Sequence, residues 1–205
     1  MSKNVFDYVT ALFNKAGYRL YMIGGATRDY LLKRPILDYD FCTDATPDEM
    51  RIFLSGGIFT FAKFGTVMLK VDGIKVDITT LRVEGQYDDY RHPSYVKFTK
   101  SIEEDYVRRD FTINAIYMDE HYKLIDMCGG IDDLNNGIIR FIGDPDQRIK
   151  EDPLRIARAE RFEKVLGFKI EDKSFQAIQR NRYLLDELNP QKVKDEYDKI
   201  KKSFK

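Results

Sequence analysis

The stretch that most constrains the fold is GGATRDYLLKRPILDYD, which occupies residues 24–40. The residues before it, YRLYMI, predict a short strand, and ATRDYLLKR predicts a helix that opens behind Gly24 and Gly25. LDYDFCT then alternates polar and apolar residues, which predicts a second strand. A strand, a glycine turn, a helix and a strand in close succession indicate a sheet with helices packed against it.

Asp38 and Asp40 lie on the second predicted strand. Successive side chains on a strand point to opposite faces, so both carboxylates project from one face, about 7 Å apart. They repel each other and raise each other's pKa unless a cation lies between them. Mg²⁺ prefers oxygen ligands and keeps positions open for water and substrate phosphates, and two such ions can stabilise the attacking and leaving oxygens of a phosphoryl displacement. The alternative is the solvated face of an edge strand.

The glycine pair before the predicted helix favours phosphate binding, which complements a metal site at the aspartates. Between a strand and a helix N-terminus, Gly24 and Gly25 allow backbone N–H groups to approach phosphate oxygens. Arg28, one turn into the helix, adds a forked donor for the same oxygens. A glycine pair with a surface arginine is common by itself, but phosphate donors followed closely by metal-type carboxylates are much less often accidental. Asp77 in IKVDITT either completes the metal site from another strand or pairs with Lys75 or Arg82.

The rest of the chain divides into a mixed part and a helical part. TVMLKV and IKVDITTL flank Asp72-Gly73, a strong hairpin signal, and TPDE at 46–49 is a helix start signal. Residues 83–98 are polar and rich in tyrosine, which indicates a mobile loop. After Phe141 no strand is predicted. Further helices are predicted over 4–15, 152–166, 173–180 and 191–203. We therefore predict domains at 1–140 and 141–205.

Composition excludes several classes of function. The 34 basic and 34 acidic residues give zero net charge, which argues against holding nucleic acid by bulk charge alone. A local basic face remains in QRIKEDPLRIARAERFEK. No apolar run is long enough to span a membrane and no signal peptide is seen, so we expect a cytoplasmic protein. Two cysteines without metal-ligand spacing and two isolated histidines argue against a zinc site.

Three motifs occur in register: GGATRDYLLKRPILDYDF, RRDFTINAIYM at 108–118 and EDPLRIARAERF at 151–162. Together they resemble the class II tRNA nucleotidyltransferases and bacterial poly(A) polymerases, within the DNA polymerase beta nucleotidyltransferase superfamily. The resemblance implies an α+β fold, with a mixed sheet and flanking helices in a nucleotidyltransferase head, followed by a short all-α neck. It implies a template-independent, Mg²⁺-dependent enzyme that uses CTP and ATP to add C and A to tRNA 3′ ends, releasing pyrophosphate.

The resemblance also assigns roles to residues. Asp38 and Asp40 would hold Mg²⁺, Gly24, Gly25 and Arg28 would bind the triphosphate, Arg109 would contact the nucleotide, and Asp110 and Asn114 would lie close to the sugar.

In the family, protein side chains of the third motif select the incoming base. Asp152 and Arg155 are three residues apart, hence predicted neighbours on one helical face. The acid would accept from the amino group of C or A, and the guanidinium would donate to a ring nitrogen or carbonyl. Arg158 and Arg161 continue the predicted face and would reach phosphate or base. The alternative is a charged helix face without a ligand.

Several alternatives stay open. The undiminished 83–98 segment favours A addition over CC addition, because the family uses it to switch from C to A. An A-only or poly(A)-adding enzyme shares the motifs, whereas the intact aspartate pair speaks against a non-catalytic binding module. Family members generally continue into body and tail domains, so we expect a short member: a piece of a longer enzyme, a minimal enzyme, or a subunit with a homodimeric or RNA-holding partner. Thr27 stands where the family more often has valine.

Overall fold

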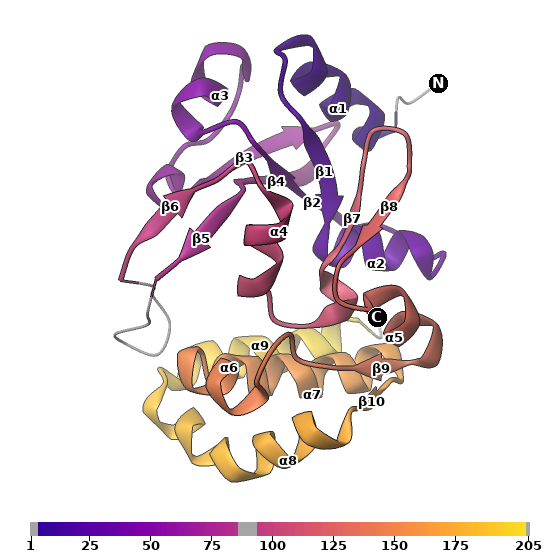
Figure 1. The fold of residues 1–205 in the computed structure, drawn as a ribbon, viewed down its shortest axis with the longest axis vertical. Coiled ribbons are helices and arrows are strands. Elements are labelled where there is room, and N and C mark those ends of the chain that lie inside the picture. Colours follow the sequence, from indigo (N-terminus) through magenta and orange to yellow (C-terminus); the bar gives the residue numbers. More distant parts are fainter. Residues whose placement is uncertain (1–3, 86–93, 204–205) are drawn as a thin grey trace. The chain divides into compact units, whose positions relative to one another are not determined.

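The computed structural model describes residues 4–85 and 94–203 (Figure 1). The chain divides into two compact units that are interleaved along the sequence. The first comprises residues 1–83, 96–108 and 114–127, and the second comprises residues 84–95, 109–113 and 128–205. The domain boundary placed at residue 140 from the sequence stays a prediction.

The first unit is built on a six-stranded sheet in the order β3-β4-β2-β1-β7-β8. Its strands are β1 (Leu20–Ile23), β2 (Asp38–Thr43), β3 (Thr66–Val71), β4 (Ile74–Thr80), β7 (Ile116–Met118) and β8 (Leu124–Asp126). β2 and β4 run parallel, and the other neighbouring pairs are antiparallel. The sheet is therefore mixed, and the expected α+β class is confirmed.

The predicted hairpin joins β3 to β4. Asp72 has φ 50° and Gly73 has φ 84°, the left-handed pair that the commonest two-residue hairpin turn requires. The register runs from Thr66 opposite Thr79 to Val71 opposite Ile74 without interruption.

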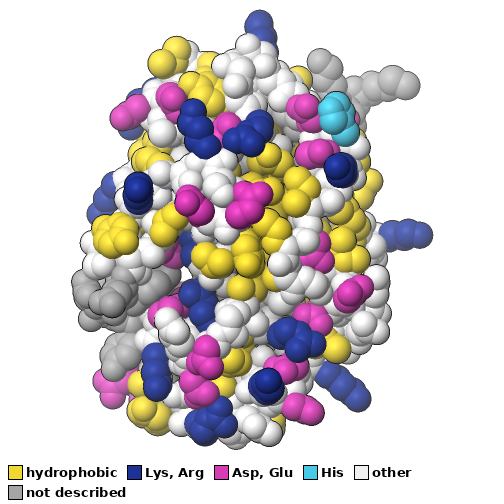
Figure 2. Space-filling view, in the orientation of Figure 1, with side chains coloured by type: hydrophobic (Ala, Val, Ile, Leu, Met, Phe, Trp, Pro, Cys, Tyr) yellow, Lys and Arg dark blue, Asp and Glu magenta, His cyan; other side chains and the backbone are white. Residues whose placement is uncertain are grey.

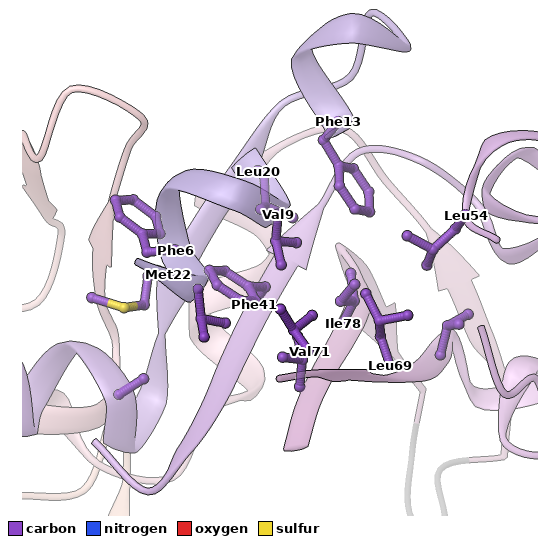
Figure 3. Close-up of a cluster of buried hydrophobic side chains, with 14 of the residues drawn as sticks. Phe6, Val9, Phe13, Leu20, Met22, Phe41, Leu54, Leu69, Val71 and Ile78 are labelled. Atoms are coloured by element: carbon purple, nitrogen blue, oxygen red, sulfur yellow. The ribbon is translucent and has the colours of Figure 1, made fainter. Parts of the chain in front are cut away.

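One face of this sheet carries the main apolar core. Helix α1 (Val5–Lys15) buries Phe6, Val9 and Phe13 against sheet residues that include Phe41 and Ile78 (Figure 3). Full burial of side chains of this size contributes about 1.5–3 kcal/mol each.

Two further helices flank the sheet. Helix α3 (Pro47–Phe53) begins at the predicted start signal, and the structure shows a capping box there: the Thr46 hydroxyl accepts from the Glu49 N–H at 3.3 Å and Glu49 Oε2 accepts from the Thr46 N–H at 2.7 Å. Helix α2 (Gly24–Leu31) connects β1 to the segment before β2.

The remaining elements of this region are short. They are α4 (Ile102–Asp105), the 3-10 turns η1 (Ala62–Phe64), η2 (Tyr106–Arg108) and η3 (Thr112–Asn114), and the strand pair β5 (Arg82–Glu84) and β6 (Val96–Phe98). β5 and β6 fall at the ends of the predicted 83–98 loop, so the flanks of that segment are strands. The interior of the predicted loop, residues 86–93, lies outside the described residues.

The second unit is mainly helical. It contains α5 (Gly130–Asn136), α6 (Pro145–Glu151), α7 (Leu154–Leu166), α8 (Asp172–Asn181), η4 (Arg182–Glu187) and α9 (Pro190–Lys202). The last three predicted helices are confirmed as α7, α8 and α9. The expectation of no strand after Phe141 is wrong, because β10 (Lys169–Ile170) pairs in parallel with β9 (Ile138–Ile139). Two residues are too few to show an alternating pattern.

Phe111 ties the 109–113 segment into this unit. It is fully buried, and its ring centroid lies 4.8 Å from that of Phe141 and 5.7 Å from that of Phe162. In the parts of both units that the structure describes, no helix has the length and apolar character needed to cross a bilayer.

Candidate active site

The glycine pair and the aspartate pair meet in the first unit. Ile23, the last residue of β1, lies opposite Asp40 of β2 in the antiparallel register. Gly24 follows with φ 69°, a backbone conformation that favours glycine. A Cβ atom placed on Gly24 would lie 3.1 Å from Asp40 Oδ2. The positive φ therefore favours glycine at this turn, and a Cβ here would also contact the Asp40 carboxylate tightly.

Three carboxylates share one sheet face with a lysine. In the parallel pairing of β2 and β4, Asp38 lies opposite Lys75 and Asp40 lies opposite Asp77. The predicted common face of Asp38 and Asp40 follows directly from this register. Asp38 is exposed, whereas Asp40 and Asp77 are half-buried.

Asp77 adopts the pairing that the sequence left as its alternative. Lys75 Nζ donates to Asp77 Oδ2 at 2.5 Å. This hydrogen bond raises the pKa of Lys75 against the opposing effect of burial, and the charges of Asp77, Asp38 and Asp40 add to the rise. The lysine therefore stays charged and partly offsets the repulsion among the acids.

The donor set of this face fits a divalent cation. Asp77 Oδ1 is buried and accepts no hydrogen bond from the part of the chain that the structure describes, a costly arrangement that a cation would relieve. Across residues 4–85 and 94–203, no three acidic, histidine or cysteine side chains form a complete metal site. Mg²⁺ is commonly held by one or two carboxylates together with phosphate oxygens of a bound ligand, so the residues fit a divalent metal that takes its remaining ligands from outside the protein.

Arg28 is a buried, oriented donor on α2. Its Nη1 donates to Asn114 Oδ1 at 3.0 Å, and its Nη2 and Nε donate to Asp29 Oδ1 at 2.9 and 3.0 Å. Two predicted nucleotide-binding residues from different motifs, 86 positions apart, therefore meet. Within the described residues, no side chain caps the N-terminus of α2 and no acid occupies its first turn, so its N–H groups and dipole favour an anion.

In the second unit, Asp110 and Arg158 form an ion pair. Arg158 Nε donates to Asp110 Oδ2 at 2.8 Å, while Asp110 Oδ1 accepts from the N–H of Phe111 at 2.7 Å. The charge of Asp110 raises the pKa of Arg158. Arg109 is held through its carbonyl oxygen, which accepts from Arg148 Nη2 at 2.9 Å.

Asp152 and Arg155 do not share a helix. Asp152 lies between α6 and α7 in an extended conformation (φ −147°, ψ 95°). The predicted helical neighbourhood is thus wrong, because Pro153 disfavours helical geometry at the residue before it. Asp152 instead caps α7: its Oδ1 accepts from the Leu154 N–H and its carbonyl oxygen from the Arg155 N–H, both at 3.1 Å.

The other arginines of α7 are also engaged by acids or carbonyls. Arg155 is buried, and its Nη1 donates to Arg148 O at 2.6 Å and to Glu151 Oε2 at 2.9 Å. Arg161 Nε donates to Glu196 Oε1 at 2.6 Å. Their predicted contacts with phosphate or base stay predictions.

Glu196 is the buried partner that the sequence reading missed. It is 3% exposed on α9. A signal for it existed, because Glu196 falls on the apolar stripe of Val193, Tyr197 and Ile200. Burial raises the pKa of Glu196, but the hydrogen bond from Lys199 and the charges of Arg161 and Arg158 outweigh it, so the pKa is lowered.

On the face that Figure 2 shows, acidic and basic side chains are interspersed, in keeping with the zero net charge.

Comparisons with known proteins show which family the chain resembles. A family model described as the poly A polymerase head domain matches residues 20–140. The CCA-adding enzyme of Lactobacillus helveticus is 43% identical over 185 residues, which are 90% of this chain and 46% of that protein. The chain thus spans about half the length of the curated relatives it matches.

Solved structures show the same likeness. The Bacillus stearothermophilus CCA-adding enzyme in complex with CTP superposes with a TM-score of 0.86 at 36% identity, over 95% of this chain and 47% of that one. The Thermotoga maritima CCA-adding enzyme complexed with tRNA gives a TM-score of 0.77 at 28% identity, over 96% of this chain and 46% of that one. The family model covers more than half of this sequence. The chain belongs to the poly A polymerase head domain family, that of the class II tRNA nucleotidyltransferases and bacterial poly(A) polymerases that its three motifs resemble.

Proposed function

We propose that the chain transfers C and A from CTP and ATP to the 3′ end of tRNA without a template and releases pyrophosphate. The observation that carries the proposal is that Gly24, at the start of α2, lies next to the Asp40 carboxylate, since a Cβ built on Gly24 would be 3.1 Å from Asp40 Oδ2. It joins the donors that suit a triphosphate to the carboxylates that suit its metal. The CCA-adding activity named for the matched relatives supports the same reaction.

The triphosphate would be held by α2. Gly24 and Gly25 present backbone N–H groups at the uncapped helix N-terminus, where anions are stabilised. Arg28 adds a guanidinium whose direction is set by Asn114 and Asp29. A preoriented fork loses less conformational freedom when it binds phosphate oxygens than a mobile one would.

Asp38 and Asp40 would hold Mg²⁺, and Asp77 is the third candidate ligand. When bound, the metal would activate the RNA 3′-hydroxyl and stabilise the charge that develops on the leaving pyrophosphate. The protein's own contribution is the sheet register, which keeps Asp40 beside Asp77. Lys75 holds Asp77 by one oxygen and leaves the other, Oδ1, without a protein donor among the described residues.

Base selection would fall to Asp152 and Arg155. The carboxylate accepts from an exocyclic amino group, which C and A have and U lacks, and Arg155 donates to a ring nitrogen or carbonyl. Arg155 is fixed by Arg148 and Glu151, and Asp152 by its capping bonds. A nucleotide that mismatched these fixed groups would leave buried polar atoms unpaired. Arg109 would contact the nucleotide, and Asp110, held by Arg158, would support the sugar.

An A-only or poly(A)-adding activity is the second candidate, because the matching family model is named for poly A polymerase. The cytoplasmic location and a homodimeric or RNA-holding partner stay predictions.

The test is incubation with tRNA lacking its CCA end, tRNA ending in C and tRNA ending in CC, with each labelled nucleotide supplied separately and Mg²⁺ present. Addition of C and then A that stops at the complete CCA end supports the proposal. An open-ended A ladder would identify the second candidate. No incorporation by the folded protein would contradict both and indicate a binding module.

A further inference from the structure

A fully buried carboxylate outside the site lies at the end of α4. Asp105 has no exposed surface. Its neighbours Ile102 and Tyr106 and its partner Tyr117 belong to the apolar cluster on the same sheet face as Asp40. Burial of an ionised carboxylate is costly unless it is paired and hydrogen-bonded.

Asp105 binds groups from three separate stretches of the first unit. Its Oδ1 accepts from the backbone N–H of Arg82 at 3.1 Å and from Arg108 Nε at 2.8 Å. Its Oδ2 accepts from the hydroxyl of Tyr117 at 2.8 Å. The arginine supplies the compensating charge, and its side chain is itself only 14% exposed.

Two of these partners stand where the chain leaves the first unit. The first unit is interrupted after residue 83 and again after residue 108. Arg82 is the second-last residue before the first exit, and Arg108 is the last residue before the second. One buried carboxylate therefore bonds to a residue at each exit, to the backbone of Arg82 and to the side chain of Arg108.

The second exit leads straight into the RRDF motif. Arg109 and Asp110 follow Arg108 without any intervening residue. Because a trans peptide allows only two soft dihedrals per residue, fixing Arg108 restricts the position and direction from which Arg109 begins. If Asp105 only stabilised the fold, any paired and hydrogen-bonded arrangement of its carboxylate would be enough. Its partners would not need to lie at the two exits.

On the basis of the proposed function, we propose that Asp105 is a positioning residue for nucleotide binding. It acts through Arg108 on the backbone that carries Arg109 and Asp110. Loss of the carboxylate frees this backbone, so CTP and ATP bind less tightly, whereas the carboxylates of β2 and β4 keep their register.

The main variant is Asp105→Asn, which preserves shape and removes the charge. We expect KM for CTP and for ATP to rise about tenfold, the effect of losing one charge-assisted hydrogen bond, with kcat changed less. Hydrogen exchange should accelerate in peptides covering 106–112 and stay unchanged in the β3–β4 hairpin.

Two comparisons separate positioning from stability. Tyr117→Phe removes one bond to the same carboxylate without touching either exit, so it should lower the melting temperature and leave KM unchanged. Asp119→Asn makes the same chemical change at an acid that caps the turn after β7, where its Oδ1 accepts from the N–H groups of His121 and Lys123. It should leave both KM and exchange at 106–112 unchanged.

If Asp105→Asn does not fold, Arg108→Gln tests the same exit with the carboxylate intact, and the same rise in KM and exchange is expected. Unaltered KM and exchange in a folded Asp105→Asn or Arg108→Gln would overturn the proposal. An equal rise in KM for Tyr117→Phe would also overturn it. Absence of transfer by the unaltered chain would count against the proposed function alone, since hydrogen exchange measures the effect of Asp105 independently.

Discussion

The two units differ in how their charged side chains are paired. On β2 and β4 of the first unit, three carboxylates share a face with Lys75, and one carboxylate oxygen has no protein donor among the described residues. On α7 of the second unit, Arg155, Arg158 and Arg161 each bind an acid of the same unit. Excess like charge favours capture of a cation from outside, whereas matched charge fixes side chains in place. The first unit is thus suited to metal and phosphate, and the second to rigid recognition.

The largest expected effect is at Asp40. Asp40→Asn should lower nucleotide transfer at least about a thousandfold, since a metal ligand is lost, while the melting temperature stays equal or rises because carboxylate repulsion is relieved. Initial rates and thermal melts measure the two quantities. Asp48→Asn is the matched control, an acid of α3 whose side chain is 97% exposed. A clear fall in melting temperature for Asp40→Asn alone would contradict the comparison.

The opposite result is expected in the second unit. Glu196→Gln should lower the free energy of unfolding by about 3 kcal/mol, because the buried ion pair between Glu196 and Arg161 is broken. Urea denaturation measures this value. A loss below about 1 kcal/mol would show that the pair behaves like an exposed one.

The contribution of Glu196 to stability should depend on pH. The pKa of Glu196 is lowered from its ordinary 4.5, so its contribution is present above that value and is lost as pH falls through the lowered pKa. The stabilities of the unaltered protein and of Glu196→Gln, measured from pH 6 downward, should therefore begin to converge near pH 4.5 and become equal only below the lowered pKa. A constant difference at every pH would contradict this assignment.

Gly24→Ala tests whether activity depends on the contact between the Gly24 turn and the Asp40 carboxylate. We expect kcat/KM to fall about tenfold or more, because the added methyl group crowds Asp40 Oδ2. Gly73→Ala is the control: its φ is 84°, yet a Cβ there has no neighbour within 4 Å. Both variants should lose about 1 kcal/mol of stability from the left-handed backbone. Only Gly24→Ala should lose activity, and equal activity in both would separate the turn from the site.

The smallest effect concerns a neutral polar group. Thr27 is fully buried, and its hydroxyl has no hydrogen-bond partner in the described part of the chain. Thr27→Val, the residue that the resemblance favours there, should raise the free energy of unfolding by about 1 kcal/mol because an unsatisfied hydroxyl is removed. A destabilised Thr27→Val protein would indicate a hydrogen bond that the structure does not show.

Much of the fold could be predicted from patterns among neighbouring residues. The alternation of LDYDFCT, the Asp72-Gly73 turn and the start of α3 after Thr46 depend on neighbouring residues, and each was predicted correctly from the sequence. The strands β7 and β8 have three residues each, which is too short for a period to be seen.

The site divides in the same way. The shared face of Asp38 and Asp40 follows from strand geometry, whereas the bond between Arg28 and Asn114 joins positions 86 apart and no local pattern encodes it. Pro153 was a readable signal that Asp152 lies outside α7. The pairing of Asp105 with two chain exits depends on the completed sheet.

The most direct test of the account is the coupling between metal and nucleotide. CTP is titrated calorimetrically into the unaltered chain and into Asp40→Asn, with and without Mg²⁺. We expect Mg²⁺ to strengthen CTP binding about tenfold or more in the unaltered chain and much less in the variant. Equal strengthening in both proteins would contradict a shared metal and phosphate site at Gly24 and Asp40.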